Sequence, residues 1–118
     1  MPTSCAKIKL KHGSSGRVKE WANELNRRAD EVLAALRSEG VILEAAFLDS
    51  QADGDYLLYI MRSDDFEKAQ AAARQSTASI DTFHEAFKKT CWESSRKLNP
   101  LIDFSTDRSD SSRSSRGP

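Results

Sequence analysis

The stretch that most constrains the fold of this chain is segment 41–61, VILEAAFLDSQADGDYLLYIM. Two runs rich in β-forming residues, 41–48 and 56–61, flank the polar segment 50–55. Gly54 and the aspartates beside it tolerate the backbone conformations that a chain reversal needs. The pattern therefore predicts a β-hairpin, which the rest of the fold has to accommodate.

A strand and a helix are predicted before the hairpin. In residues 5–11, CAKIKLK, apolar side chains alternate with Lys7 and Lys9, a pattern typical of a strand with one apolar and one cationic face. Apolar residues then recur at helical spacing over residues 18–36, and Gly40 follows them as a left-handed helix terminus would. We expect one continuous helix there.

Two helices and a strand are predicted after the hairpin. Asp64 and Glu67 have the spacing of a capping box, so a short helix should begin there and run to about residue 76. Residues 80–92 repeat apolar side chains at helical spacing and predict another helix. Residues 98–105, LNPLIDFS, predict the last strand, at a sheet edge or starting late because Pro100 lacks an N–H.

The order strand, helix, strand, strand, helix, strand is that of the ferredoxin-like βαββαβ fold, an α+β class with an antiparallel sheet under helices. We expect one such domain over residues 1–105. Residues 106–118, rich in serine and arginine, contain no large apolar side chain and are expected to form a disordered tail. The sheet face turned away from the helices keeps apolar hairpin residues, which favours a homodimer packed sheet to sheet.

Composition excludes several classes of protein. Lys+Arg and Asp+Glu number 18 each, so no basic surface for nucleic acid is indicated. No apolar run is long enough to span a membrane, and no export signal precedes residue 5. Cys5 and Cys91 lack metal-site spacing and are expected to be reduced, which favours a cytoplasmic protein.

Four segments carry a resemblance to a known family: AKIKLKHGSSGRVKEWANELNRR, FLDSQADGDYLLYIMR, IDTFHEAFKKTCW and LIDF. With them the chain resembles a bacterial family of small proteins of unassigned function within the dimeric α+β barrel superfamily. The resemblance implies two ferredoxin-like protomers whose sheets close into a barrel. That superfamily includes cofactor-independent monooxygenases, EthD-like and NIPSNAP-like proteins and rhamnose mutarotases, and no motif here selects one of these chemistries.

His84 and Tyr59 are the candidate catalytic residues. His84 lies within the apolar stripe of the helix predicted over residues 80–92. Such an imidazole either has its basicity tuned for proton transfer or is a structural group whose two nitrogens bond the backbone or a carboxylate. Tyr59 offers a phenol for proton transfer, or else packs in the sheet.

Candidate binding residues come mainly from the strands. If the far face of the sheet lines a barrel, Lys7 or Lys9 needs a partner, and Glu44 and Asp103 are the strand carboxylates available. Such a pair either binds an anionic group of a substrate or only satisfies itself. Trp92 either covers a cavity or packs against a neighbour.

Two functions remain open from the sequence. One is a small-molecule enzyme or binding protein, an isomerase, mutarotase or monooxygenase-like protein with its pocket between sheet and helices. It would act without cofactor or metal on a small organic ligand, because phosphate-loop, zinc and nucleophile-elbow motifs are absent from the sequence. The other is a non-catalytic dimeric interaction or regulatory module.

Overall fold

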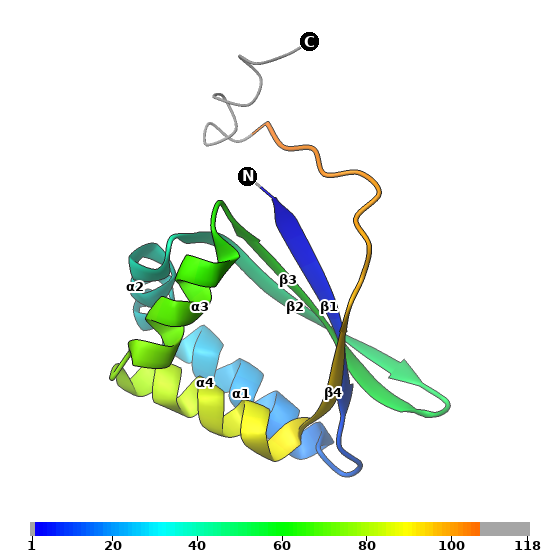
Figure 1. Ribbon diagram of the computed structural model, residues 1–118. Coiled ribbons are helices and arrows are strands. Elements are labelled where there is room, and N and C mark those ends of the chain that lie inside the picture. The colour runs from blue at the N-terminus through cyan, green and yellow to red at the C-terminus, as the bar shows by residue number, and fades with distance from the viewer. Residues whose placement is uncertain (1, 107–118) are drawn as a thin grey trace.

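The computed structural model describes residues 2–106, in which four antiparallel strands form one sheet with helices on one of its faces (Figure 1). The strand order is β2-β3-β1-β4. The elements are β1 (Thr3–Leu10), α1 (Ser15–Arg27), α2 (Ala29–Glu39), β2 (Val41–Gln51), β3 (Gly54–Ser63), α3 (Phe66–Gln75), α4 (Ser79–Cys91) and β4 (Trp92–Lys97). The predicted α+β, ferredoxin-like architecture is confirmed. The predicted tail, apart from residue 106, lies outside the described residues.

The predicted hairpin is present and longer than the sequence indicated. β2 and β3 pair from Val41 and Ser63 down to Gln51 and Gly54, and the turn lies between them. Gly54 has φ +139°, a conformation that side-chain-bearing residues rarely adopt. The free end of this hairpin extends past the helices (Figure 1).

The first helical segment is two helices, so the prediction of one continuous helix is wrong. The chain leaves helical geometry at Arg28, with φ −106° and ψ 36°. The Arg28 guanidinium bonds both Glu31 and Ser79 Oγ, which ties the break to the start of α4. The change of direction lets α1 pack on α4 while α2 contacts β2 and α3. Gly40 ends α2 with φ 74°, as predicted.

The last strand lies earlier in the chain than predicted, so the prediction of a strand over residues 98–105 is wrong. β4 begins at Trp92, directly after α4, and pairs with β1 as far as Lys97 opposite Ala6. Its sequence, WESSRK, is polar and nearly all exposed, so no alternation marks it as a strand. Residues 98–105 are irregular, with Leu98 N donating to Cys5 O (2.9 Å) before Pro100 interrupts the donors.

The start of α3 is also one residue later than predicted. Asp65, not Asp64, caps the helix, because its side chain accepts a hydrogen bond from Lys68 N at 3.0 Å. β3 continues to Ser63, whose hydroxyl accepts from Asp65 N at 3.3 Å. Because the strand extends to Ser63, the helix cap lies one residue later than the capping-box spacing predicted.

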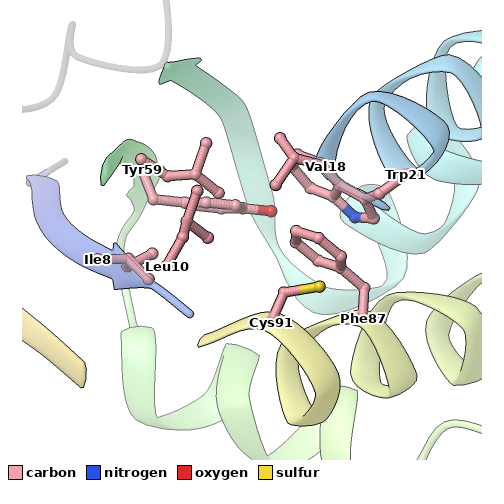
Figure 2. Packing of buried hydrophobic residues seen from close by; sticks show 8 residues of the cluster. Ile8, Leu10, Val18, Trp21, Tyr59, Phe87 and Cys91 are labelled. Carbon is pink, nitrogen blue, oxygen red and sulfur yellow. The ribbon is translucent and has the colours of Figure 1, made fainter. Parts of the chain in front are cut away.

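The core joins the helix-facing side of the sheet to α1 and α4 (Figure 2). Trp21 stacks on Phe87 with ring centroids 4.5 Å apart and planes 8° apart. Tyr59 projects from the sheet with its hydroxyl directed at these helices (Figure 2). The buried residues of the cluster are Ile8, Leu10, Val18, Trp21, Leu57, Tyr59, Phe87 and Cys91. Among residues 2–106, no helix is long and apolar enough to cross a bilayer.

The strand register divides the sheet into the two faces that the sequence predicted. Ile8 lies opposite Leu57 on the helix side, whereas Lys7 lies opposite Leu58 on the far side. The far side keeps large apolar residues exposed, Phe47 at 58% and Leu43 at 43%. Both cysteines, Cys5 and Cys91, are free thiols, as predicted.

Candidate functional site

A cavity of about 280 Å³ lies between the helix-facing side of the sheet and the helices α2, α3 and α4. All four strands contribute to its floor, the three helices form most of its walls, and Leu25 of α1 also lines it. Apolar side chains form much of the lining. Polar lining residues include Glu39, Glu44, Tyr59, Asp81, His84 and Lys88.

Small side chains explain why this space is not filled. α3 presents Ala69 and Ala73 to the cavity, and the cross-strand neighbour of Tyr59 in β1 is Ala6, which also lines it. Alanine side chains are too short to fill the space between α3 and the sheet, so a cavity remains there. The same alternation of β2 that turns Phe47 outward turns Glu44 toward the helices, opposite Met61.

Four side chains of the site form a hydrogen-bonded chain. Trp21 Nε1 donates to His84 Nδ1 at 3.0 Å, His84 Nε2 lies 3.3 Å from Tyr59 Oη, and Tyr59 Oη donates to Glu44 Oε2 at 2.7 Å. An indole N–H can only donate, so His84 Nδ1 must be the unprotonated nitrogen. The proton of the neutral ring then sits on Nε2 and is donated to Tyr59. The direction of all three bonds is fixed.

The environment holds His84 neutral and Tyr59 protonated. Burial, helped by the nearby charge of Lys88, lowers the pKa of His84 to about 4. Protonating Nδ1 would in addition cost the bond from Trp21. Burial, followed by the charge of Glu44, raises the pKa of Tyr59 well above its ordinary value. Burial also raises the pKa of Glu44, and the hydrogen bond from Tyr59 opposes that effect.

Glu39 is a further carboxyl group in the cavity, and it was not among the residues predicted from the sequence. It ends α2, directly before the left-handed Gly40. Burial raises its pKa to about 7, with the charges of Asp81 and Glu44 acting in the same direction and Lys88 opposing them. A carboxylate in the last turn of a helix faces the negative end of the helix dipole. That unfavourable placement is the sequence signal that could have identified it.

The family model for the family of unknown function DUF6176 matches residues 1–109. The chain belongs to DUF6176. No curated protein matches it. The resemblance that the sequence indicated, to a family without an assigned function, is therefore confirmed.

Solved structures show the fold of this DUF6176 chain at low sequence identity. An L-rhamnose mutarotase from Formosa agariphila is 15% identical and has a TM-score of 0.59, over 89% of this chain and 100% of that one. A protein from Agrobacterium tumefaciens is 12% identical with a TM-score of 0.56, over 88% of this chain and 96% of that one. At these identities the likeness concerns the fold alone.

The structure brings together four of the seven residues selected from the DUF6176 sequence. His84, Tyr59, Glu44 and Trp92 all line the cavity. The Trp92 ring lies edge-on to Tyr59, with centroids 6.0 Å apart, and Lys88 Nζ lies 4.9 Å from the Trp92 ring centroid. The indole N–H of Trp92 is buried and has no hydrogen-bond partner among the described residues. The two partners of His84 are side chains, not the backbone or a carboxylate.

The other three selected residues lie elsewhere. Lys7 Nζ sits 4.6 Å from the Tyr56 ring centroid on the far side of the sheet, and Lys9 pairs with Glu93 at 3.7 Å. Neither lysine meets Glu44 or Asp103, so the expected pairing is not found. The register accounts for this, because the far side carries the lysines while Glu44 faces the helices.

Asp103 anchors the irregular segment that follows β4. Its carboxylate accepts hydrogen bonds from Thr3 N and Thr3 Oγ1, both at 2.8 Å, and lies 3.9 Å from Arg62 Nη2. It is not among the residues that line the cavity. These contacts hold the segment against the start of β1.

Proposed function

We propose that this DUF6176 protein is a small-molecule enzyme of the isomerase or mutarotase type that works by proton transfer in the cavity between sheet and helices. The observation that carries the proposal is the directed chain from Trp21 through His84 and Tyr59 to Glu44. It ends on a carboxyl group that lines the cavity. Such a chain fixes both the position and the protonation of each member before a ligand arrives.

Within this proposal Glu44 is the group that exchanges a proton with the ligand. One of its oxygens accepts from Tyr59, which leaves the other oxygen as a base. Burial strengthens that base by raising its pKa. His84 and Tyr59, the candidates from the sequence, then act as positioning residues, because His84 has both nitrogens bonded and Tyr59 keeps its proton. Trp92 contributes an aromatic wall for the ligand.

The cavity favours a small ligand. Its volume of about 280 Å³ lies just below the range of ~300–1,000 Å³ that is usual for ligand pockets. Aldoses and other small hydroxy-carbonyl compounds suit this size and a lining that mixes carboxyl groups with apolar side chains. A solved protein of this fold is an L-rhamnose mutarotase, so L-rhamnose is the first ligand to test. The proposal needs no cofactor.

The proposal includes a homodimer. Phe47 and Leu43 leave an apolar surface on the far side of the sheet, and in the segment after β4 Leu101 and Phe104 are 94% and 89% exposed. A second copy of the chain would cover both surfaces, because exposed apolar area of this kind is typical of an interface. We also place the protein in the cytoplasm, which two free thiols support.

The second candidate function is a non-catalytic dimeric interaction module. The exposed residues that favour a dimer favour this function equally. In that case the hydrogen bonds of His84 serve stability alone. The two candidates make opposite predictions for ligand turnover.

The deciding experiment is NMR measurement of anomeric exchange for L-rhamnose and a panel of other aldoses. We expect the wild-type protein to accelerate the exchange of at least one sugar. Glu44→Gln should reduce the acceleration by ~10²-fold or more, the usual contribution of a general base. Glu67→Gln makes the same chemical change on the exposed side of α3 and should leave the rate unchanged. No acceleration by the wild type would leave the interaction module as the function.

A further inference from the structure

We propose that Glu39 is the second catalytic carboxyl group of this site, which donates a proton to the ligand while Glu44 accepts one. This inference rests on the proposed function above. It assigns a role to a residue outside the hydrogen-bonded chain. It also makes the chemistry bifunctional, because acid and base would act on one ligand at the same time.

The backbone around Glu39 is fixed on both sides. α2 ends at Glu39, Gly40 reverses the chain in the left-handed conformation, and β2 begins at Val41. Ser63 Oγ donates to the Gly40 carbonyl at 2.8 Å, which ties this corner to the end of β3. The Glu39 carboxyl is thus presented to the cavity from a helix end that cannot easily move, on the chain segment that also carries Glu44.

The other carboxyl groups that line the cavity already have partners, whereas Glu39 has none among the described residues. Asp81 accepts from Ser76 Oγ. Glu85 pairs with Lys88 at 3.3 Å, and Lys88 also lies against the Trp92 ring. Among the described residues, no hydrogen bond or ion pair engages Glu39. The pattern leaves one half-buried carboxyl group free to bond a ligand.

Burial and the charges that line the cavity favour the protonated form of Glu39. β2 contributes Glu44, and β3 contributes the neutral Tyr59. α4 contributes Asp81, Glu85, Lys88 and the neutral His84, and β4 contributes Lys97. Burial and the charges of Asp81 and Glu44 raise the pKa of Glu39 to about 7, and the charge of Lys88 opposes them. Glu44 differs, because the hydrogen bond from Tyr59 stabilises its ionised form. One carboxyl group therefore suits the acid role and the other the base role.

The two roles balance for anomeric exchange of a cyclic sugar. Glu44 takes the proton of the anomeric hydroxyl as its oxygen forms the carbonyl, the bond from the anomeric carbon to the ring oxygen breaks, and Glu39 gives its proton to that ring oxygen. The open-chain aldehyde then rotates about its terminal carbon–carbon bond. Ring closure on the other carbonyl face reverses both transfers. The hydroxyl that attacks the carbonyl carbon returns its proton to Glu39, and Glu44 gives its proton to the carbonyl oxygen, which becomes the anomeric hydroxyl again. No oxidant, reductant or further reactant is needed.

The test is the pH dependence of anomeric exchange, measured by NMR with the sugar that the wild type turns over fastest. The wild type should give a bell-shaped profile whose alkaline limb falls near pH 7, where Glu39 loses its proton. Glu39→Gln should lose the alkaline limb and reduce the maximal rate by ~10²-fold. Glu39→Asp keeps an acid and should recover part of the rate. Glu67→Gln is the matched control and should keep the wild-type profile.

A second readout does not depend on turnover. The side-chain carboxyl carbon of Glu39, followed by NMR in the free protein, should titrate with the same midpoint as the alkaline limb. If the wild type is active but Glu39→Gln keeps that limb, Glu39 is not the acid and the proposed function stands. If the wild type exchanges no sugar, the proposed function fails and the role of Glu39 fails with it.

Discussion

Replacing Glu39 by glutamine should stabilise the folded protein at alkaline pH. The free carboxyl has a pKa of 4.5, and the folded protein raises it to about 7. Between these values the unfolded chain ionises while the folded chain keeps its proton, so the wild type loses stability as pH rises, and the full penalty is present above pH 7. A shift of this size corresponds to about 3 kcal/mol. Solvent reaches the half-buried carboxyl and screens it, which reduces the expected penalty to about 1–2 kcal/mol.

Glutamine has nearly the same shape and carries no charge, so it removes the penalty without opening a cavity. Urea unfolding at pH 4, 6 and 8 should show Glu39→Gln more stable than wild type by about 1–2 kcal/mol at pH 8, by less at pH 6, and by nothing at pH 4. Glu67→Gln should follow the wild type at every pH. Equal or lower stability of Glu39→Gln at pH 8 would refute the reasoning, as would a gain that persists at pH 4.

Three further results are expected. Trp21→Phe keeps the stack on Phe87 but leaves His84 Nδ1 without its donor, so chemical denaturation should show a loss of ~1–3 kcal/mol. In wild type, ¹⁵N NMR should find the His84 proton on Nε2 and no imidazolium until pH falls to about 4. Acidification from pH 7 to 4 should therefore remove stability through His84, because the unfolded imidazole takes up its proton near pH 6.5. Phe47→Asp should convert the expected dimer to a monomer by light scattering, whereas Asp53→Asn in the hairpin turn should not.

The parts of the fold that local chemistry determines could be predicted from the sequence. Gly54 in the turn and Gly40 at the end of α2 adopt the positive φ values that glycine allows, so both positions could be predicted. The alternation around Ile8 identified β1 and its buried side. β4 could not be predicted in this way, because an exposed polar edge strand carries no alternation and obtains its structure by pairing with β1. The break at Arg28 likewise depends on a contact with Ser79, which is distant in sequence.

The candidate site was predictable where it depends on strand and helix faces. His84, Tyr59 and Glu44 follow from those faces once the register is known. The sequence left the register of the hairpin open, and with it the side of the sheet on which Glu44 would lie. Glu39 was missed because its one local signal, a carboxyl group directly before the helix-ending Gly40, does not show that the end of α2 meets β2 beside a gap left by the alanines of α3.

Glu39 helps to decide between an enzyme and an interaction module, whereas the hydrogen-bonded chain from Trp21 to Glu44 does not. Every polar atom of Trp21, His84 and Tyr59 has a partner, so a purely structural role would account for them. A structural role does not account for Glu39, which is half-buried, lies at the negative end of a helix and has no partner among the described residues. An uncompensated carboxyl group of this kind costs stability that a glutamine would restore. If Glu39→Gln is more stable than wild type and also loses the alkaline limb of the pH profile of anomeric exchange, Glu39 lowers the stability of the folded protein and is needed for catalysis.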